Sequence, residues 1–239
     1  MKLVIYSDDE RHRKPIEMSA KKFGFDLHIA TGTYRWYKDL ETRTRKTLEV
    51  LETFDPDELV VVTDGHDVFV NNTADEFKKA YKQHYDGKIV FQSEHQNWPD
   101  PRLKEKCLEK FTDPDGYSFL CFGMHAGTAS QLVELYRKGL WLGQVDDELK
   151  QINPHLNWSF DDQLFAVIQY LQRDDIVIDA GCHLCQSLQG PALNSGDVIF
   201  YEESINNITK QTRPVFVHGH GSVQIKKIYD QIVERYGYA

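Results

Sequence analysis

The apolar run Leu59-Val60-Val61-Val62 limits the possible folds more than any other part of the sequence. A strand built only from apolar, mostly β-branched residues is typical of a sheet that is covered on both faces. Shorter apolar runs that favour strands recur along the chain and alternate with segments of helical spacing. Strands that alternate with helices predict an α/β fold, with a mostly parallel sheet between two layers of helices.

The pattern predicts most element boundaries along the chain. The predicted strands cover residues 3–6, 26–30, 59–62, 68–70, 88–91, 118–124, 176–178, 198–200 and 214–217. The predicted helices cover residues 15–23, 40–54, 74–85, 129–138, 161–171 and 224–236, and an aromatic-rich loop is expected at 31–37. A chain of 239 residues can bury a large core as one domain, without disulfides or a structural metal.

Charge and hydropathy restrict the partners and the compartment. The chain carries 37 acidic and 28 basic side chains, a net charge of −9. Proteins that bind nucleic acid through its phosphates normally have a basic surplus, so this class is disfavoured. No apolar stretch is long enough to span a membrane, and the N-terminal apolar run is too short for a signal peptide. We therefore expect a soluble, cytoplasmic protein, although a secretory context stays open, and the oligomeric state is not indicated.

Four cysteines are present, and Cys182 and Cys185 form a single C-x-x-C motif. A structural zinc site would need two more ligands at similar spacing, and the sequence has no second C-x-x-C. Reduced thiols are the simplest interpretation, and a redox or zinc role for this pair stays open.

Two aspartates, Asp64 and Asp67, follow the apolar run at 59–62 directly. Ligands of open α/β sheets bind beyond the carboxyl ends of the strands. Neighbouring carboxylates repel each other unless a cation or proton intervenes, and Mg²⁺ and Mn²⁺ prefer such oxygen ligands. The pair therefore indicates a metal site for a phosphorylated substrate. The alternative is an acidic turn, because Asp-Gly is a common turn pair.

Two later segments carry further polar groups. Asp161 and Asp162 stand at the start of a predicted helix, where acids are often caps but can also act as a base or orient a hydroxyl. His218 ends the last predicted strand and precedes Gly219-His220-Gly221, where glycine lets the backbone approach a ligand closely. His218 could supply an imidazole to the cation, or it could be a structural histidine.

In this order, the segments resemble the glycosyltransferase domain of the procollagen lysyl hydroxylases and related collagen-type sugar transferases of animals and large viruses. The resemblance extends from about residue 40 to residue 221. It rests on a D-x-x-D element (Asp64, Asp67), Trp98-Pro99, Asp161-Asp162-Gln163-Leu164-Phe165 and a late H-G-x-G (His218 to Gly221). It implies a single GT-A domain over residues 1–239, with a Rossmann-like mixed, mostly parallel sheet flanked by helices.

The resemblance also implies roles for individual residues. Asp64, Asp67 and His218 would hold Mn²⁺, with Mg²⁺ as the alternative, against the diphosphate of a UDP-sugar. Asp161 and Asp162 would be the catalytic acids beside the reacting sugar. Glu94 and Trp98 would approach the sugar or acceptor, unless Trp98 is a core residue. The nucleotide site would include Tyr6, Ser7, Lys46, His66, Gly219 and Gly221. Arg43 and Arg45 are rivals of Lys46, which could instead lie on a solvated helix face.

The activity implied is transfer of glucose or galactose from a UDP-sugar to a hydroxyl of a protein or glycan. Hydroxylysine or galactosyl-hydroxylysine of a collagen-like chain is the acceptor that the resemblance favours. A UDP-sugar-binding domain without turnover and a metal-dependent phosphohydrolase are the alternatives. The sequence departs from the family where an N-S-G-G-like turn is replaced around Cys121 and Phe122, which leaves the sugar open. A late family lysine is replaced by Gln224, with Lys226 and Lys227 just after it.

Overall fold

The computed structural model describes residues 1–32, 40–144, 161–189, 192–193, 196–201, 203–221 and 223–238. Most of the aromatic-rich loop predicted at 31–37 lies outside these residues. No helix in the described ranges is both long enough and apolar enough to cross a membrane.

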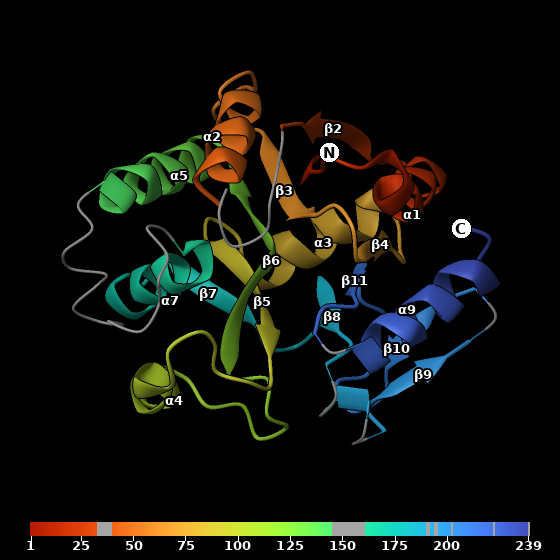
Figure 1. Ribbon diagram of the computed structural model, residues 1–239. Helices are drawn as coiled ribbons and strands as arrows, with labels where there is room; N and C mark the ends of the chain where they lie inside the picture. Colours follow the sequence, from red (N-terminus) through yellow and green to blue (C-terminus); the bar gives the residue numbers. More distant parts are fainter. Residues whose placement is uncertain are drawn as a thin grey trace.

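A six-stranded sheet forms the centre of the molecule, in the order β2-β1-β3-β6-β5-β7 (Figure 1). Its strands are β1 (Lys2–Tyr6), β2 (Asp26–Ala30), β3 (Leu59–Asp64), β5 (Ile89–Glu94), β6 (Phe119–Thr128) and β7 (Ile176–Asp179). Three of the five pairings are parallel, and β6 runs antiparallel to both of its neighbours. The predicted mixed, mostly parallel α/β sheet is therefore confirmed.

Helices cover both faces of this sheet, as the apolar run at 59–62 requires. The main helices are α1 (Glu10–Lys22), α2 (Leu40–Leu51), α3 (Ala74–His84), α4 (Lys104–Lys110), α5 (Ala129–Gln144), α7 (Asp162–Gln172) and α9 (Val223–Arg235). Side chains alternate between the faces of a strand. Val60 and Val62 accordingly join the core beneath α2, α5 and α7, whereas Val61 joins the core beneath α1 and α3. Figure 1 shows α2, α5 and α7 on one side of the sheet and α1 on the other.

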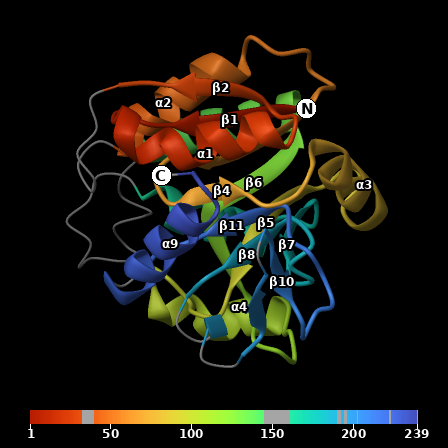
Figure 2. The same ribbon diagram turned by 90° about the vertical axis from the view of Figure 1, so that its right-hand side faces the viewer.

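A second, three-stranded sheet lies beside the first and is ordered β4-β11-β8. Its strands are β4 (Val68–Val70), β8 (Cys185–Ser187) and β11 (Phe216–His218), and Figure 2 shows them side by side. β11 is antiparallel to β4 and parallel to β8, so that His218 pairs with Val68. A short hairpin of β9 (Val198–Phe200) and β10 (Ile205–Asn207) completes the strands that the structure describes. The loop from β3 to β4 therefore connects the two sheets.

Four short elements were not predicted from the sequence. They are the 3-10 helix Pro101–Leu103, α4, β8 and β10. The α4 sequence is mostly charged and buries only Cys107, so it lacks the apolar spacing of a helix that packs on a core. β8 (Cys-Gln-Ser) and β10 (Ile-Asn-Asn) are mostly polar, so they lack the apolar run that indicated strands of the same length at 68–70 and 198–200.

The C-x-x-C motif lies in a turn that Asp179 holds together. The Asp179 carboxylate accepts hydrogen bonds from the backbone N–H groups of His183 (2.9 Å), Leu184 (2.7 Å) and Cys185 (2.8 Å). The Tyr85 hydroxyl donates a fourth at 2.6 Å. Cys182 and Cys185 are buried free thiols within this turn. Burial raises the pKa of each thiol, which keeps both protonated.

Candidate functional site

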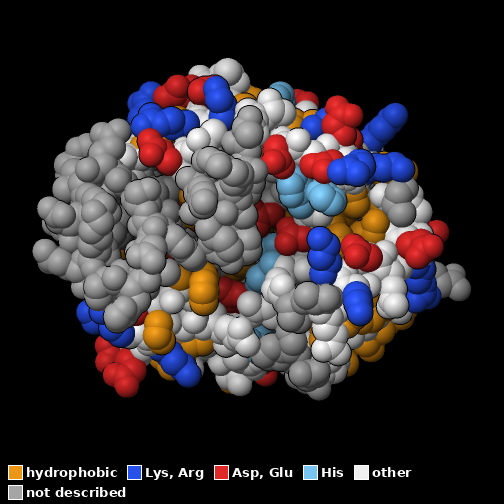
Figure 3. Space-filling model, viewed as in Figure 1, with side chains coloured by type: hydrophobic (Ala, Val, Ile, Leu, Met, Phe, Trp, Pro, Cys, Tyr) orange, Lys and Arg blue, Asp and Glu red, His pale blue; other side chains and the backbone are white. Residues whose placement is uncertain are grey.

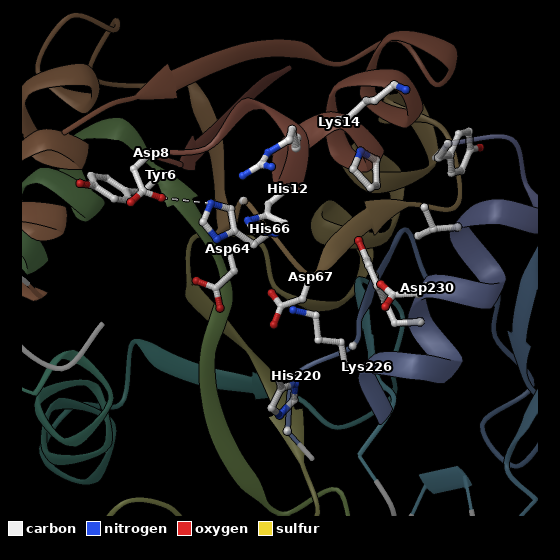
Figure 4. A pocket seen from close by; sticks show the side chains of 18 of the residues that line it. Tyr6, Asp8, His12, Lys14, Asp64, His66, Asp67, His220, Lys226 and Asp230 are labelled. Carbon is white, nitrogen blue, oxygen red and sulfur yellow. Dashed lines mark ion pairs between the residues drawn. The ribbon is translucent and has the colours of Figure 1, made fainter. Parts of the chain in front are cut away.

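The aspartates lie where β3 leaves the central sheet. Asp64 is the last residue of β3, and its parallel partner on β1 is Tyr6. A Cβ atom at Gly65 would collide with the Tyr6 carbonyl oxygen, so only glycine lets the loop pass this close to β1. The loop then turns into β4 and presents Asp67 on the same side as Asp64 (Figure 4).

His218 reaches this loop from the end of β11. The Gly219 N–H donates to the Asp67 carbonyl oxygen at 2.8 Å, which fixes the end of β11 against the loop. His218 Nε2 lies 3.4 Å from Asp64 Oδ2 and 3.4 Å from Asp67 Oδ1. The Gln92 side chain meets Nδ1 of the same ring at 3.0 Å and fixes its orientation. One ligand atom from each of the three side chains lies within 4.8 Å of the other two.

This donor set suits a hard divalent cation. Two carboxylates and one imidazole fit Mn²⁺ or Mg²⁺, and nitrogen ligation favours Mn²⁺ of the two. Burial would raise the pKa of Asp64, but the positive charge of Arg43 and a hydrogen bond from His218 hold it well below its usual range. Burial opposes protonation of His218, yet the charge of Asp67 and a hydrogen bond to Asp64 raise its pKa well above normal. The two carboxylates thus favour a positive charge at the position they share with His218.

Arg43, from the first turn of α2, is the basic residue that the structure brings to the aspartates. Its Nη2 donates to Asp64 Oδ1, and its Nη1 lies 3.9 Å from Asp162 Oδ2. The Lys46 ammonium instead pairs with Glu49 at 2.8 Å, and Arg45 pairs with Glu41 at 2.5 Å. Of the three basic candidates on this helix, Arg43 connects the metal-binding loop with the acidic pair.

The two acids at the start of α7 have different surroundings. Asp161 is the N-cap residue, and its carboxylate accepts a hydrogen bond from the Leu164 N–H at 2.8 Å. Burial, with the charge of Asp162 added, raises the pKa of Asp161 to about 7. Asp162 faces Arg43, and burial raises its pKa despite that neighbour. The cap interpretation thus describes the contact of Asp161, whereas Asp162 lies toward the aspartate loop.

Asp161→Asn tests this division through the pH dependence of stability. Because burial raises the pKa of Asp161 from 3.8 to about 7, ionisation destabilises the folded wild type as the pH rises through this window. Asparagine caps a helix as well as aspartate and carries no charge. We expect the variant to exceed the wild type in free energy of unfolding by up to about 4 kcal/mol at pH 8, and by much less at pH 5.

Urea denaturation at the two pH values, without added metal, measures this difference. Asp174→Asn is the matched control, because Asp174 is fully exposed beyond the other end of α7. A stability difference that does not change with pH would contradict the assignment.

A pocket of about 810 Å³ opens beside the aspartates. Figure 3 shows acidic and histidine side chains gathered at a hollow in this face. Of the predicted residues, its lining includes Tyr6, Asp64, His66, Asp67, Gly219 and Gly221. The lining also contains Arg11, His12 and Lys14, which the sequence did not place there, together with Arg43, the rival of Lys46, and Lys226. Figure 4 labels His12, Lys14 and Lys226 among them. Lys226 lies two residues after Gln224, so a basic side chain still reaches the pocket.

Two predicted nucleotide-binding residues, Tyr6 and His66, line this pocket, whereas the third, Ser7, is buried and does not line it. The Ser7 hydroxyl lies 2.9 Å from His66 Nε2, and the Asp8 carboxylate is 3.5 Å from the same atom. The Tyr6 hydroxyl donates to the Gly32 carbonyl oxygen at 2.9 Å. The His66 ring is about one-third exposed, so one surface is open to a ligand.

The predicted sugar-binding residues are joined by Gln163. Its Nε2 donates to Glu94 Oε1 at 3.1 Å and to the Trp98 carbonyl oxygen at 3.2 Å. The Trp98 side chain itself is 52% exposed, which excludes the core interpretation of this residue. Glu94 is buried, and its Oε2 lies 3.0 Å from His220 Nε2.

Comparison with known proteins finds relatives by sequence and by fold. The family model described as "PLOD GT domain" matches residues 10–233. The chain is 29% identical, over 180 residues, to "Uncharacterized protein R699" of Acanthamoeba polyphaga mimivirus, an alignment that covers 75% of this chain and 35% of the relative. It is 27% identical to human "Multifunctional procollagen lysine hydroxylase and glycosyltransferase LH3", covering 72% of this chain and 22% of the relative. The chain thus spans about a third and about a fifth of these two relatives.

A solved structure shares the fold over nearly the whole length. It is a glycosyltransferase involved in the glycosylation of the major capsid of PBCV-1, with a TM-score of 0.55 and 11% identity. The superposition covers 98% of both chains. At this identity the match establishes the similarity of fold.

Proposed function

The chain belongs to the PLOD GT domain family, and from this premise we propose that it is a Mn²⁺-dependent hexosyltransferase. In this proposal it moves glucose or galactose from a UDP-sugar to a hydroxyl group of a protein or glycan. Hydroxylysine or galactosyl-hydroxylysine in a collagen-like chain is the acceptor we favour. The observation that carries the proposal is the convergence of Asp64, Asp67 and His218 beside an open pocket.

In this proposal, different residues of the pocket bind the metal ion, the nucleoside and the diphosphate. Mn²⁺ bound by Asp64, Asp67 and His218 would neutralise the charge that develops on the departing UDP. Tyr6 and His66 would bind the nucleoside, and the buried Ser7 would hold the His66 ring through its hydroxyl group. The backbone of Gly219 and Gly221 would approach the diphosphate, where Lys226 and Arg43 add positive charge.

Asp162 is the residue that we assign to the acceptor side. It is buried, and within the described part of the chain its Oδ2 accepts no hydrogen bond and is approached only by Arg43 at 3.9 Å. Its raised pKa suits a group that accepts a proton from an acceptor hydroxyl. Trp98, with its exposed ring, would offer a face for a sugar, and Glu94 would bind a sugar hydroxyl.

Asp162→Asn should lower the transfer rate by about a hundredfold or more, because asparagine cannot accept the proton. UDP should still bind with its normal affinity, since Asp162 lies beyond the aspartate loop. Transfer assays and isothermal titration with UDP and Mn²⁺ measure the two quantities. Asp174→Asn, a fully exposed carboxylate beyond the end of the same helix, is the control. Loss of UDP affinity in Asp162→Asn would place this residue in the nucleotide site instead.

The proposed activity is tested with UDP-glucose and UDP-galactose, each with and without Mn²⁺. A ligand that binds only the folded chain raises its melting temperature, and UDP release reports turnover. Turnover that depends on Mn²⁺ and prefers uridine supports the transferase. A thermal shift without turnover would indicate a binding domain, and phosphate release from simple phosphate esters would indicate a phosphohydrolase.

A further inference from the structure

Cys121 and His220 lie 99 residues apart in the sequence and meet behind the aspartate loop. Cys121 belongs to β6, and its Sγ lies 3.9 Å from Nε2 of His220, which follows β11. His218 is the third member of this group, since one ligand atom from each side chain lies within 4.8 Å of the others. Cys121 and His218 are almost completely buried. The group occurs where the sequence departs from the N-S-G-G-like turn of the family.

These donor atoms differ in kind from those of the aspartate loop. One sulfur and two imidazole nitrogens form a soft set, which suits Zn²⁺ better than Mn²⁺ or Mg²⁺. Three protein ligands with a fourth position left open are also found in catalytic zinc sites.

The polar groups around the three side chains are those expected around a metal site. Metal-binding histidines are usually held by a second polar group on the ring, and Gln92 Oε1 lies 3.0 Å from His218 Nδ1. Glu94 Oε2 lies 3.0 Å from His220 Nε2, within reach as an oxygen ligand, and Gln163 fixes the other Glu94 oxygen at 3.1 Å. Among the residues that the structure describes, the buried His220 Nδ1 has no hydrogen-bond partner.

An ion can reach the group from solvent. His220 lines the same pocket as Asp64 and Asp67, and its side chain is about one-fifth exposed. Figure 4 shows His220 below the two aspartates in this view, on the same side of the pocket.

We propose that Cys121, His218 and His220 bind Zn²⁺, at a site that shares His218 with the Asp64–Asp67 site. A neutral imidazole has only one nitrogen with a free lone pair, so His218 can serve one ion at a time. Zinc at this site therefore excludes Mn²⁺ from the aspartates. This binding does not depend on the proposed sugar transfer, and it can be measured without any sugar.

Co²⁺ is the probe that reports the sulfur ligand, because it replaces Zn²⁺ and gives a thiolate charge-transfer band in the near ultraviolet. We expect this band to appear when Co²⁺ is added to the metal-free chain in the presence of a non-thiol reductant. Adding Zn²⁺ should then abolish the band. Cys121→Ser should lose the band and bind Zn²⁺ at least about tenfold more weakly in competition with a chromophoric chelator. Cys107→Ser, which removes a buried thiol on α4, should retain both properties.

A second pair of variants separates the two metal sites. Asp67→Asn should keep the cobalt band, because Asp67 is not one of the soft ligands, whereas His220→Gln should weaken it. Mn²⁺ bound to the wild-type chain, followed by electron paramagnetic resonance, should be displaced by Zn²⁺. The displacement should need at least about tenfold more Zn²⁺ in Cys121→Ser.

The proposal would be overturned if Cys121→Ser kept the wild-type cobalt spectrum and zinc affinity while Asp67→Asn lost them. In that case the ion would bind the aspartates alone. Circular dichroism checks that each variant is folded, and His220→Gln decides the question if Cys121→Ser does not fold. A failure of sugar transfer would leave these binding measurements unaffected.

Discussion

Replacing Asp67 by asparagine is expected to lower Mn²⁺-dependent UDP release by about a thousandfold or more. The change removes one of two charged oxygen ligands, and a metal that stabilises a leaving diphosphate contributes several kcal/mol to the transition state. The fold should persist, because the backbone carbonyl of Asp67, not its side chain, accepts the hydrogen bond from Gly219. Steady-state UDP release and the Mn²⁺-induced thermal shift measure the two effects.

Asp75→Asn is the matched control, since Asp75 is a highly exposed carboxylate in the first turn of α3. It should leave both the rate and the thermal shift unchanged. Wild-type activity in Asp67→Asn would remove this residue from the metal site and leave the transferase proposal without its central observation.

Gly123→Ala is expected to weaken metal binding strongly, because it displaces the His218 ring. A Cβ atom at position 123 would lie 3.0 Å from His218 Nε2 and closer still to two other ring atoms. The ring is buried, and Gln92 holds its Nδ1, one of the two atoms that the Cβ would hit, so the ring must leave its position for the methyl group to fit. We expect Mn²⁺ affinity to fall by about a hundredfold or more. Overpacking should also lower the free energy of unfolding by about 1–3 kcal/mol.

Gly127→Ala, on the same strand, provides the control for a methyl group added to β6. The nearest atom to a Cβ there is Gln131 Oε1 at 3.1 Å, the end of a flexible side chain. This variant should bind Mn²⁺ normally in a direct titration. If Gly123→Ala also bound Mn²⁺ with wild-type affinity, the His218 ring would not be a ligand in the observed position.

Most of the central sheet could be predicted, because its strands are apolar runs that can be recognised in the sequence. The run at 59–62 predicted a strand buried on both faces, and Val60, Val61 and Val62 do alternate between two cores. The direction of β6 could not be predicted, because an apolar run is equally compatible with a parallel and an antiparallel strand. The short strands β8 and β10 take their conformation from tertiary contacts, such as the pairing of β8 with β11.

The candidate site was predictable only where its residues are neighbours in sequence. Asp64 and Asp67 indicated a metal from their position after a strand, but their approach to His218 depends on the resemblance and on the fold. Lys46 and Arg43 occupy the same helix, and a difference of three residues decides which one points to the aspartates. Sequence spacing alone could not make that choice, and the structure brings Arg43 to them.

Two further assignments depended on a hydrogen bond and on exposure to solvent, and neither can be determined from the sequence. Asp161 and Asp162 are adjacent and chemically identical, and only the contact with Leu164 separates the helix cap from its neighbour. Trp98 could have been a core residue, and its 52% exposure decides against this. The contact of Cys121 with His220 could not be predicted. The two residues are 99 positions apart, and the sequence singled them out for other reasons: Cys121 departs from a family turn, and His220 belongs to the H-G-x-G element.

The position of His218 on the small sheet has a consequence for local unfolding. Asp64 ends a strand of the large sheet, Asp67 lies in the connecting loop, and His218 ends β11 of the small sheet. An ion held by all three would cross-link the two sheets, so β11 could not detach without first releasing the ion. Amide hydrogens of β4 and β11 should then exchange with deuterium more slowly in the presence of Mn²⁺, whereas those of β2, at the far edge of the large sheet, should change little.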